Sequence, residues 1–151
     1  MRLSLLTVLI LCFFLSLPLT AQNWTAEEQE VLDQIKKGWT FWEKAVQAKD
    51  LNLWIDNMQP ADDWSGWWTS DGGLWTHEKE ERLFDKWVEN VNDYYWEGLQ
   101  PLSIKVYDDF ALAYFYATYN IEDKTGKVTR YEDKRLEVYR KIDGIWGWER
   151  T

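Results

Sequence analysis

An alternating stretch near the end of the chain holds the residues best suited to chemistry. If residues 128–142 form a strand, one of its faces gathers Tyr131, Asp133, Arg135, Glu137 and Tyr139. Burial of that face would raise the pKa of the Glu137 carboxyl, whereas Arg135 beside it would lower that pKa. Glu137 is therefore the candidate catalytic residue, as a general base or acid, with tyrosine hydroxyls as proton donors. The alternative interpretation is an Arg135–Glu137 ion pair that only stabilises the sheet.

The sequence offers little for histidine or metal chemistry. His77 is the single histidine, and no motif supplies it with a Ser or Cys nucleophile, so we interpret it as a solvated residue at the start of a helix. Asp62, Asp63 and Asp71 follow no calcium-loop spacing. We therefore predict neither a metal nor a cofactor.

Tryptophan is unusually frequent, with 12 among 151 residues. Four of these residues fall on the apolar faces of predicted helices and are expected in the core: Trp39, Trp42, Trp54 and Trp87. Four others lie in or beside a polar, glycine-containing stretch: Trp64, Trp67, Trp68 and Trp75. There they could stack against sugar rings, aromatic molecules or lipids, or form a lid over a pocket.

Charge and length exclude several classes of protein. The chain has 17 basic and 26 acidic residues and a net charge of −9. Nucleic acid and anionic membrane surfaces are therefore unfavourable partners, because both require clustered positive charge. A length of 151 residues suits one domain.

Residues 1–21 have the pattern of a signal peptide. Arg2 is followed by an apolar stretch to Leu17, then by Pro18 and a small residue at Ala21. We predict export to the periplasm or the medium, cleavage after Ala21 and no stable membrane association afterwards, with an uncleaved anchor as the alternative. The single cysteine, Cys12, lies in this segment, so residues 22–151 can form no disulfide.

The periodicity of residues 22–151 predicts helices followed by strands. A capping-box pattern at Thr25 and Glu28 begins a helix over 25–49, and Asp50 caps a short second helix that Pro60 ends. Thr76 caps a third helix with an apolar stripe that continues to Val91. After Gly98 the pattern alternates and predicts strands over 102–107, 110–121, 128–142 and 145–150. This order indicates an α+β fold with an antiparallel meander.

The last part of the chain resembles a known family. The run from Leu136 to Trp146, with its Asp143-Gly144 turn, is similar to the terminal hairpin of the SnoaL-like (DUF4440-type) branch of the NTF2-like superfamily. The resemblance extends over residues 22–151. It implies a cone in which three N-terminal helices pack on a strongly bent antiparallel sheet that encloses a pocket. It also implies a homodimer formed through the sheet face that carries Leu136 and Val138.

Together with the apolar helix faces, this resemblance implies one pocket with Glu137 at its floor. Its predicted ligand-binding residues are Trp42, Trp54, Trp75, Tyr116, Arg135, Tyr139 and Trp148. The function we favour is binding of a small apolar or aromatic ligand. One alternative is an isomerase or dehydratase with Glu137 as general base and Tyr131, Tyr139 or Tyr116 as proton donors. The other is a protein-interaction module that uses the Trp-rich loop 64–75.

Overall fold

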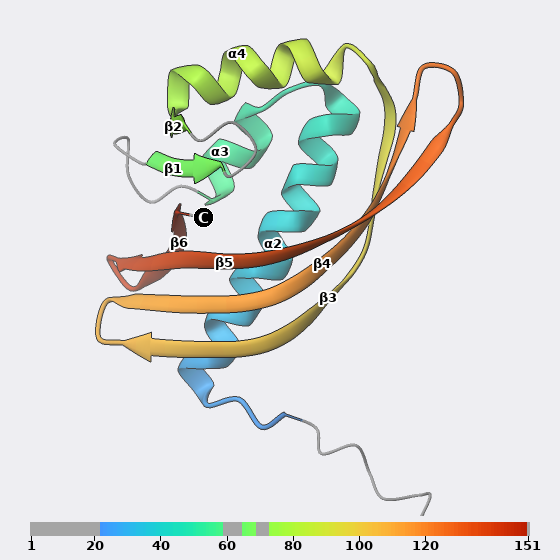
Figure 1. Ribbon diagram of the computed structural model, residues 1–151. Helices are drawn as coiled ribbons and strands as arrows, with labels where there is room; N and C mark the ends of the chain where they lie inside the picture. Colours follow the sequence, from blue (N-terminus) through green and yellow to red (C-terminus); the bar gives the residue numbers. More distant parts are fainter. Residues whose placement is uncertain (1–21, 59–64, 69–72, 151) are drawn as a thin grey trace, which may run out of the picture.

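A computed structural model describes residues 22–58, 65–68 and 73–150 (Figure 1). The side chains of residues 65–68, 73–78, 80 and 150 are not part of this description. The predicted signal peptide, residues 1–21, and most of the polar loop before residue 73 therefore lie outside the described residues.

The described part of the chain forms three helices: α2 (Ala26–Ala48), α3 (Asn52–Met58) and α4 (His77–Val88). The predicted capping box begins α2, since the Thr25 hydroxyl accepts from the Glu28 amide at 3.2 Å and the Glu28 carboxylate accepts from the Thr25 amide at 2.9 Å. The helix ends at Lys49, which has φ 57°. The prediction of a long first helix is confirmed. None of the described helices is long and apolar enough to cross a membrane.

The strands form two antiparallel sheets. The small one pairs β1 (Ser65–Trp68) with β2 (Gly73–Thr76). The large one is a meander of β3 (Val91–Tyr107), β4 (Phe110–Asp123), β5 (Val128–Ile142) and β6 (Ile145–Arg150) in that order. Figure 1 shows the large sheet curling around α2, with α3 and α4 near the C-terminal end of that helix. The predicted α+β architecture is therefore confirmed.

The start of β3 differs from the prediction. The third helix ends at Val88, and Val91 belongs to a strand that begins eleven residues before the predicted start at 102. The pairing of β3 with β4 shifts register between Val91 and Asp93, between Trp96 and Gly98, and between Pro101 and Ser103. Each bulge interrupts the two-residue alternation and bends the strand. The irregularities that curl the sheet thus also conceal β3 from a search for periodicity.

The core lies between α2 and the concave face of the sheet. Val31, Ile35 and Trp39 project from α2 and are buried. The concave face of β4 presents Ala111, Ala113, Phe115 and Ala117, all fully buried. Three of these four side chains are methyl groups, so this part of the concave face has little side-chain bulk. The space beyond Phe115, towards α3 and α4, contains the cavity described next.

Candidate functional site

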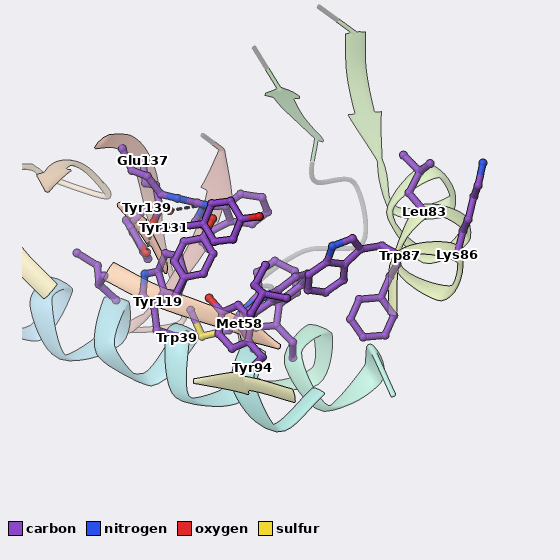
Figure 2. A pocket seen from close by; sticks show the side chains of 18 of the residues that line it. Trp39, Met58, Leu83, Lys86, Trp87, Tyr94, Tyr119, Tyr131, Glu137 and Tyr139 are labelled. Carbon is purple, nitrogen blue, oxygen red and sulfur yellow. Dashed lines mark hydrogen bonds and ion pairs between the residues drawn. The ribbon is translucent and has the colours of Figure 1, made fainter. Parts of the chain in front are cut away.

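A cavity of about 780 Å³ lies between the three helices and the concave face of the large sheet (Figure 2). The helices contribute Ile35, Gly38, Trp39, Trp42, Trp54, Met58, Leu83, Phe84, Lys86 and Trp87. The loop after α4 and the strands contribute Asn90, Tyr94, Tyr119, Ile121, Tyr131, Arg135, Glu137, Tyr139 and Trp148. Most of these side chains are aromatic or aliphatic, which is typical of a site for a small organic molecule.

Four indole rings form a connected wall of the cavity. The Trp42 ring meets Trp54 edge-on, with centroids 5.5 Å apart, and stacks on Trp87 at 6.1 Å. The Trp54 ring meets Trp148 of β6 at 5.3 Å. Side chains from α2, α3, α4 and β6 are thereby fixed relative to one another. Because the Trp42–Trp54 and Trp54–Trp148 ring planes meet at 82° and 62°, the result is an angled apolar surface that an aromatic molecule can contact by stacking or edge-on.

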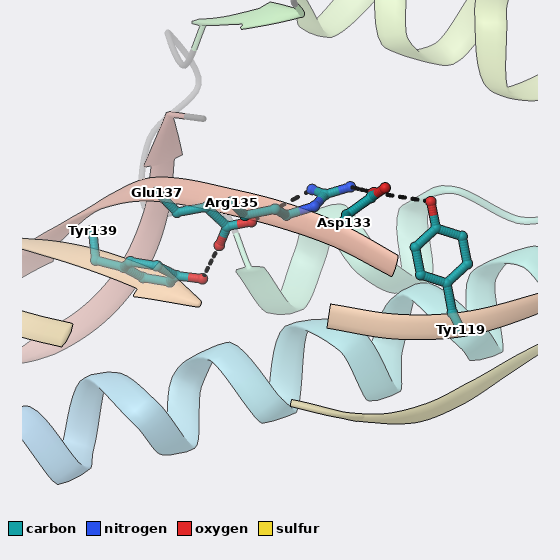
Figure 3. Close-up of polar contacts among 5 residues, drawn as sticks. All are labelled: Tyr119, Asp133, Arg135, Glu137 and Tyr139. Atoms are coloured by element: carbon teal, nitrogen blue, oxygen red, sulfur yellow. Dashed lines mark hydrogen bonds and ion pairs between the residues drawn. The ribbon is translucent and has the colours of Figure 1, made fainter. Parts of the chain in front are cut away.

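The polar groups of the cavity form a chain along β5 (Figure 3). The Arg135 guanidinium donates to Asp133 Oδ2 at 3.1 Å and contacts Glu137 Oε1 at 3.5 Å. The Tyr139 hydroxyl donates to Glu137 Oε2 at 2.6 Å, and the Tyr119 hydroxyl donates to Asp133 Oδ2 at 2.9 Å. Alternation along the strand places these four β5 side chains on one face, as predicted. The chain connects Tyr119 of β4 with Tyr139 of β5 through Asp133, Arg135 and Glu137.

Burial controls the protonation of this chain. Glu137 is 4% exposed, and burial raises the pKa of its carboxyl although Arg135 and the Tyr139 hydroxyl lower it. Burial lowers the pKa of the Arg135 guanidinium, but the nearby carboxylates of Glu137 and Asp133 raise it by more than burial lowers it. The net effect is a raised pKa for Arg135. Burial, followed by the charge of Glu137, raises the pKa of the Tyr139 hydroxyl well above its usual value. Arg135 therefore stays cationic and Tyr139 stays a hydrogen-bond donor.

The Arg135 side chain also contributes to packing. Its guanidinium carbon lies 4.8 Å from the centre of the Trp39 ring, a cation–π arrangement. Trp39 in turn stacks on Tyr119, with centroids 5.7 Å apart. The positive charge is thus held by an aromatic ring and by Asp133 and Glu137 on either side. A ligand meets a polar floor whose charges are already paired.

Six of the eight predicted site residues surround this one cavity: Trp42, Trp54, Arg135, Glu137, Tyr139 and Trp148. Tyr116 does not, and its inclusion was a register error. It pairs with Lys134 across β4 and β5, and the Lys134 ammonium lies 5.9 Å from its ring, so both side chains occupy the convex face. Phe115, which pairs with Arg135, takes the concave position instead.

The predictions for the Trp-rich stretch concern side chains outside the described residues. The backbone of Trp75 lies in β2, paired with Gly66, and Trp67 and Trp68 lie in β1. Trp64, Asp62, Asp63 and Asp71 fall outside the described ranges, as does the side chain of His77. Among the described residues, no group of three or more His, Cys, Asp or Glu side chains is arranged to hold a metal ion.

Two further tyrosines line the cavity that were not predicted from the sequence, Tyr94 and Tyr119. Tyr119 follows Phe115 and Ala117 at two-residue spacing in β4, so the register error that selected Tyr116 assigned Tyr119 to the opposite face. Tyr94 lies in the bulged start of β3, where alternation fails. Its ring stacks on Tyr119 with centroids 5.2 Å apart.

Comparison with known proteins places this architecture in one fold. No family model and no curated protein matches the sequence. Similar solved structures include an NTF2-like protein from Salmonella enterica serovar Typhimurium LT2, with 15% identity, TM-score 0.58, and coverage of 78% of this chain and 85% of that one. Another is an NTF2-like family protein from Streptomyces avermitilis, provisionally classed as a dehydratase, with 13% identity, TM-score 0.59, and coverage of 79% and 92%.

A third similar structure is the association domain of the kinase CaMKII from Caenorhabditis elegans, with 13% identity, TM-score 0.57, and coverage of 83% of this chain and 92% of that domain. The chain therefore has the NTF2-like fold. Identities this low concern the fold alone. The SnoaL-like subtype stays a prediction.

Proposed function

We propose that this protein binds a small, flat, mostly apolar or aromatic molecule in the cavity between its helices and its sheet. The observation that carries this proposal is the aromatic wall of Trp42, Trp54 and Trp148 around a cavity of about 780 Å³. Stacking on indole rings favours a flat ligand. A strongly charged ligand is disfavoured, because Asp133 and Glu137 already contact Arg135 and burial of a further unpaired charge is costly.

We also propose that the protein is exported without residues 1–21 and assembles as a homodimer. Support for the dimer comes from the convex face of the sheet, where Leu112 pairs with Val138 and Tyr114 pairs with Leu136. Leu136 is 56% exposed, which is unusual for a leucine inside a strand. A second copy placed on this patch would cover it.

Native mass spectrometry of the protein purified from its own host tests all three parts together. We expect a dimer of chains that begin at Gln22, together with a small organic molecule that is released on denaturation. Replacing Leu136 with Lys is expected to yield monomers that still carry the molecule, because this side chain lies on the face opposite Glu137.

The possible outcomes separate the parts of the proposal. A chain that retains residues 1–21 contradicts cleavage after Ala21. A wild-type monomer contradicts the dimer. A wild-type protein without a bound molecule, and without affinity for flat aromatic probes, contradicts the binding function.

A second candidate function is catalysis by Glu137. It is favoured by a buried carboxyl that lines the cavity, has a raised pKa and accepts a hydrogen bond from Tyr139. Such a group could remove a proton next to a ligand carbonyl, as isomerases and dehydratases do. Tyr139 and Tyr131 remain candidate proton donors, whereas Tyr116 on the convex face does not.

Exchange of the α-protons of 1-tetralone for deuterium, followed by NMR in D2O, tests this second function. If Glu137 is a general base, wild-type protein is expected to exchange these protons at least about 100-fold faster than the Glu137→Gln variant. Glu137→Gln keeps the side-chain shape, so binding of the ketone should change little. Equal rates for the two proteins would leave Glu137 with a binding or structural role.

The Trp-rich stretch 64–75 remains a possible protein-interaction surface. That function depends on the side chains of Trp64, Trp67 and Trp68, which lie outside the described residues.

A further inference from the structure

One polar atom on the wall of the cavity has no partner. Three tyrosines that line the cavity are buried or half-buried: Tyr94, Tyr119 and Tyr139. Tyr119 donates to Asp133 and Tyr139 donates to Glu137. The Tyr94 hydroxyl, in a side chain that is 1% exposed, has no hydrogen-bond partner among the described residues.

An unpaired buried hydroxyl is costly. Loss of its hydrogen bonds to water destabilises the folded chain, and few buried polar groups in proteins lack a partner. The ring of Tyr94 is held in place by stacking on Tyr119 at 5.2 Å, and Tyr119 stacks on Tyr131 at 5.4 Å. The ring of Tyr94 is therefore fixed in position beside a cavity built mainly of apolar groups (Figure 2), and its hydroxyl is buried.

We propose that the Tyr94 hydroxyl is the hydrogen-bond donor that recognises a neutral oxygen acceptor, such as a ketone carbonyl, on the flat aromatic ligand of this cavity. This assignment rests on the proposed binding function. It predicts a preference for ligands that carry an oxygen acceptor, because a hydrocarbon of the same shape leaves the Tyr94 hydroxyl without a hydrogen bond. Because the hydroxyl is buried, the proposal requires that the bound ligand displaces a side chain that covers it.

The surroundings of Tyr94 favour a neutral acceptor over an anion. Burial raises the pKa of the Tyr94 hydroxyl far above its usual value, so this group donates a hydrogen bond at any physiological pH. Asp133 and Glu43 raise that pKa further, whereas Arg135 lowers it. Arg135 opposes these carboxylates at the hydroxyl, but its charge is already paired with Asp133 and Glu137, so an anionic ligand would be buried without a free counter-charge from Arg135.

Three probes of one shape test the assignment: 9-fluorenone, fluorene and fluorene-9-carboxylate. Their dissociation constants are measured by quenching of tryptophan fluorescence. Wild-type protein is expected to bind 9-fluorenone about tenfold more tightly than fluorene, the effect of one hydrogen bond, and to bind the carboxylate more weakly than 9-fluorenone.

Tyr94→Phe removes only the hydroxyl. We expect the preference for 9-fluorenone over fluorene to fall below about twofold, through loss of 9-fluorenone affinity with fluorene affinity unchanged. The infrared carbonyl band of bound 9-fluorenone should lie at lower frequency in wild-type protein than in Tyr94→Phe. The melting temperature should stay the same or rise, since an unpaired buried group is removed. Tyr116→Phe, on the convex face, is the matched control and should retain the wild-type preference.

The outcomes distinguish this assignment from the function on which it rests. If wild-type protein binds none of the three probes, the proposed function fails and the assignment fails with it. If 9-fluorenone and fluorene bind equally well, or if Tyr94→Phe keeps the wild-type preference, the cavity binds flat molecules but Tyr94 does not select them.

Discussion

Replacing Arg135 with Met is expected to lower the free energy of unfolding by about 3 kcal/mol at pH 7, because it leaves Asp133 and Glu137 without their shared cation. Methionine keeps much of the length of the side chain but loses the cation–π contact with Trp39. Urea denaturation at fixed protein concentration measures the change. Lys134→Met is the matched control, since this exposed neighbour lies on the opposite face and should change stability by less than about 0.5 kcal/mol.

The pH dependence of the free energy of unfolding is expected to identify Glu137 as the source of this loss. Burial raises the pKa of Glu137 above the value of 4.5 expected in the unfolded chain. The folded chain therefore holds this proton more tightly, and the free energy of unfolding decreases as the pH rises from about 4.5 through the raised folded pKa. Arg135 lowers the pKa of Glu137, so its replacement raises that pKa further. The free energy of unfolding then decreases over a wider range of pH.

Arg135→Met should therefore be more destabilising at pH 7 than at pH 4. Glu137→Gln added to Arg135→Met should restore part of the stability at pH 7, because no buried carboxylate then remains beside Tyr139. A loss of less than about 1 kcal/mol, or an equal loss at both pH values, would mean that this ion pair is not important for folding.

Phe115→Ala is expected to destabilise the protein by about 3–5 kcal/mol, whereas Tyr116→Ala should cost less than about 1 kcal/mol. Phe115 is fully buried between the sheet and α2, and its neighbour Tyr116 points to the convex face against Lys134. Urea denaturation of both variants at one protein concentration measures the difference. If Tyr116→Ala proved the more damaging substitution, the register of β4 would be wrong by one residue.

Local signals made much of the fold predictable. The Thr25 and Glu28 capping box begins α2 where expected, because both hydrogen bonds involve residues only three positions apart. Strand β5 has the predicted bounds 128–142, and its face from Asp133 to Tyr139 follows from alternation. Two of the helix residues that line the cavity, Trp42 and Trp54, were predicted from the apolar stripes of their helices.

The parts that the sequence did not predict depend on pairing between strands. Which residue of β4 faces Arg135 is set by the register of two strands, so a slip of one residue exchanged Tyr116 for Phe115. The three register shifts of β3 are local backbone events that leave no periodic signal, and Tyr94 was missed with them. Whether the Tyr94 hydroxyl has a partner is a property of the packed core, which no sequence pattern reports.

Binding of a small aromatic molecule inside the cavity is tested most directly by the indole N–H signals of ¹⁵N-labelled protein. Trp42, Trp54 and Trp148 line the cavity, whereas the Trp146 indole donates to Glu30 and does not line it. On addition of 9-fluorenone, we predict saturable shifts of the first three signals and little change for Trp146, with each signal assigned by a Trp→Phe variant. Unchanged signals from the three cavity residues, or equal shifts for Trp146, would contradict the account.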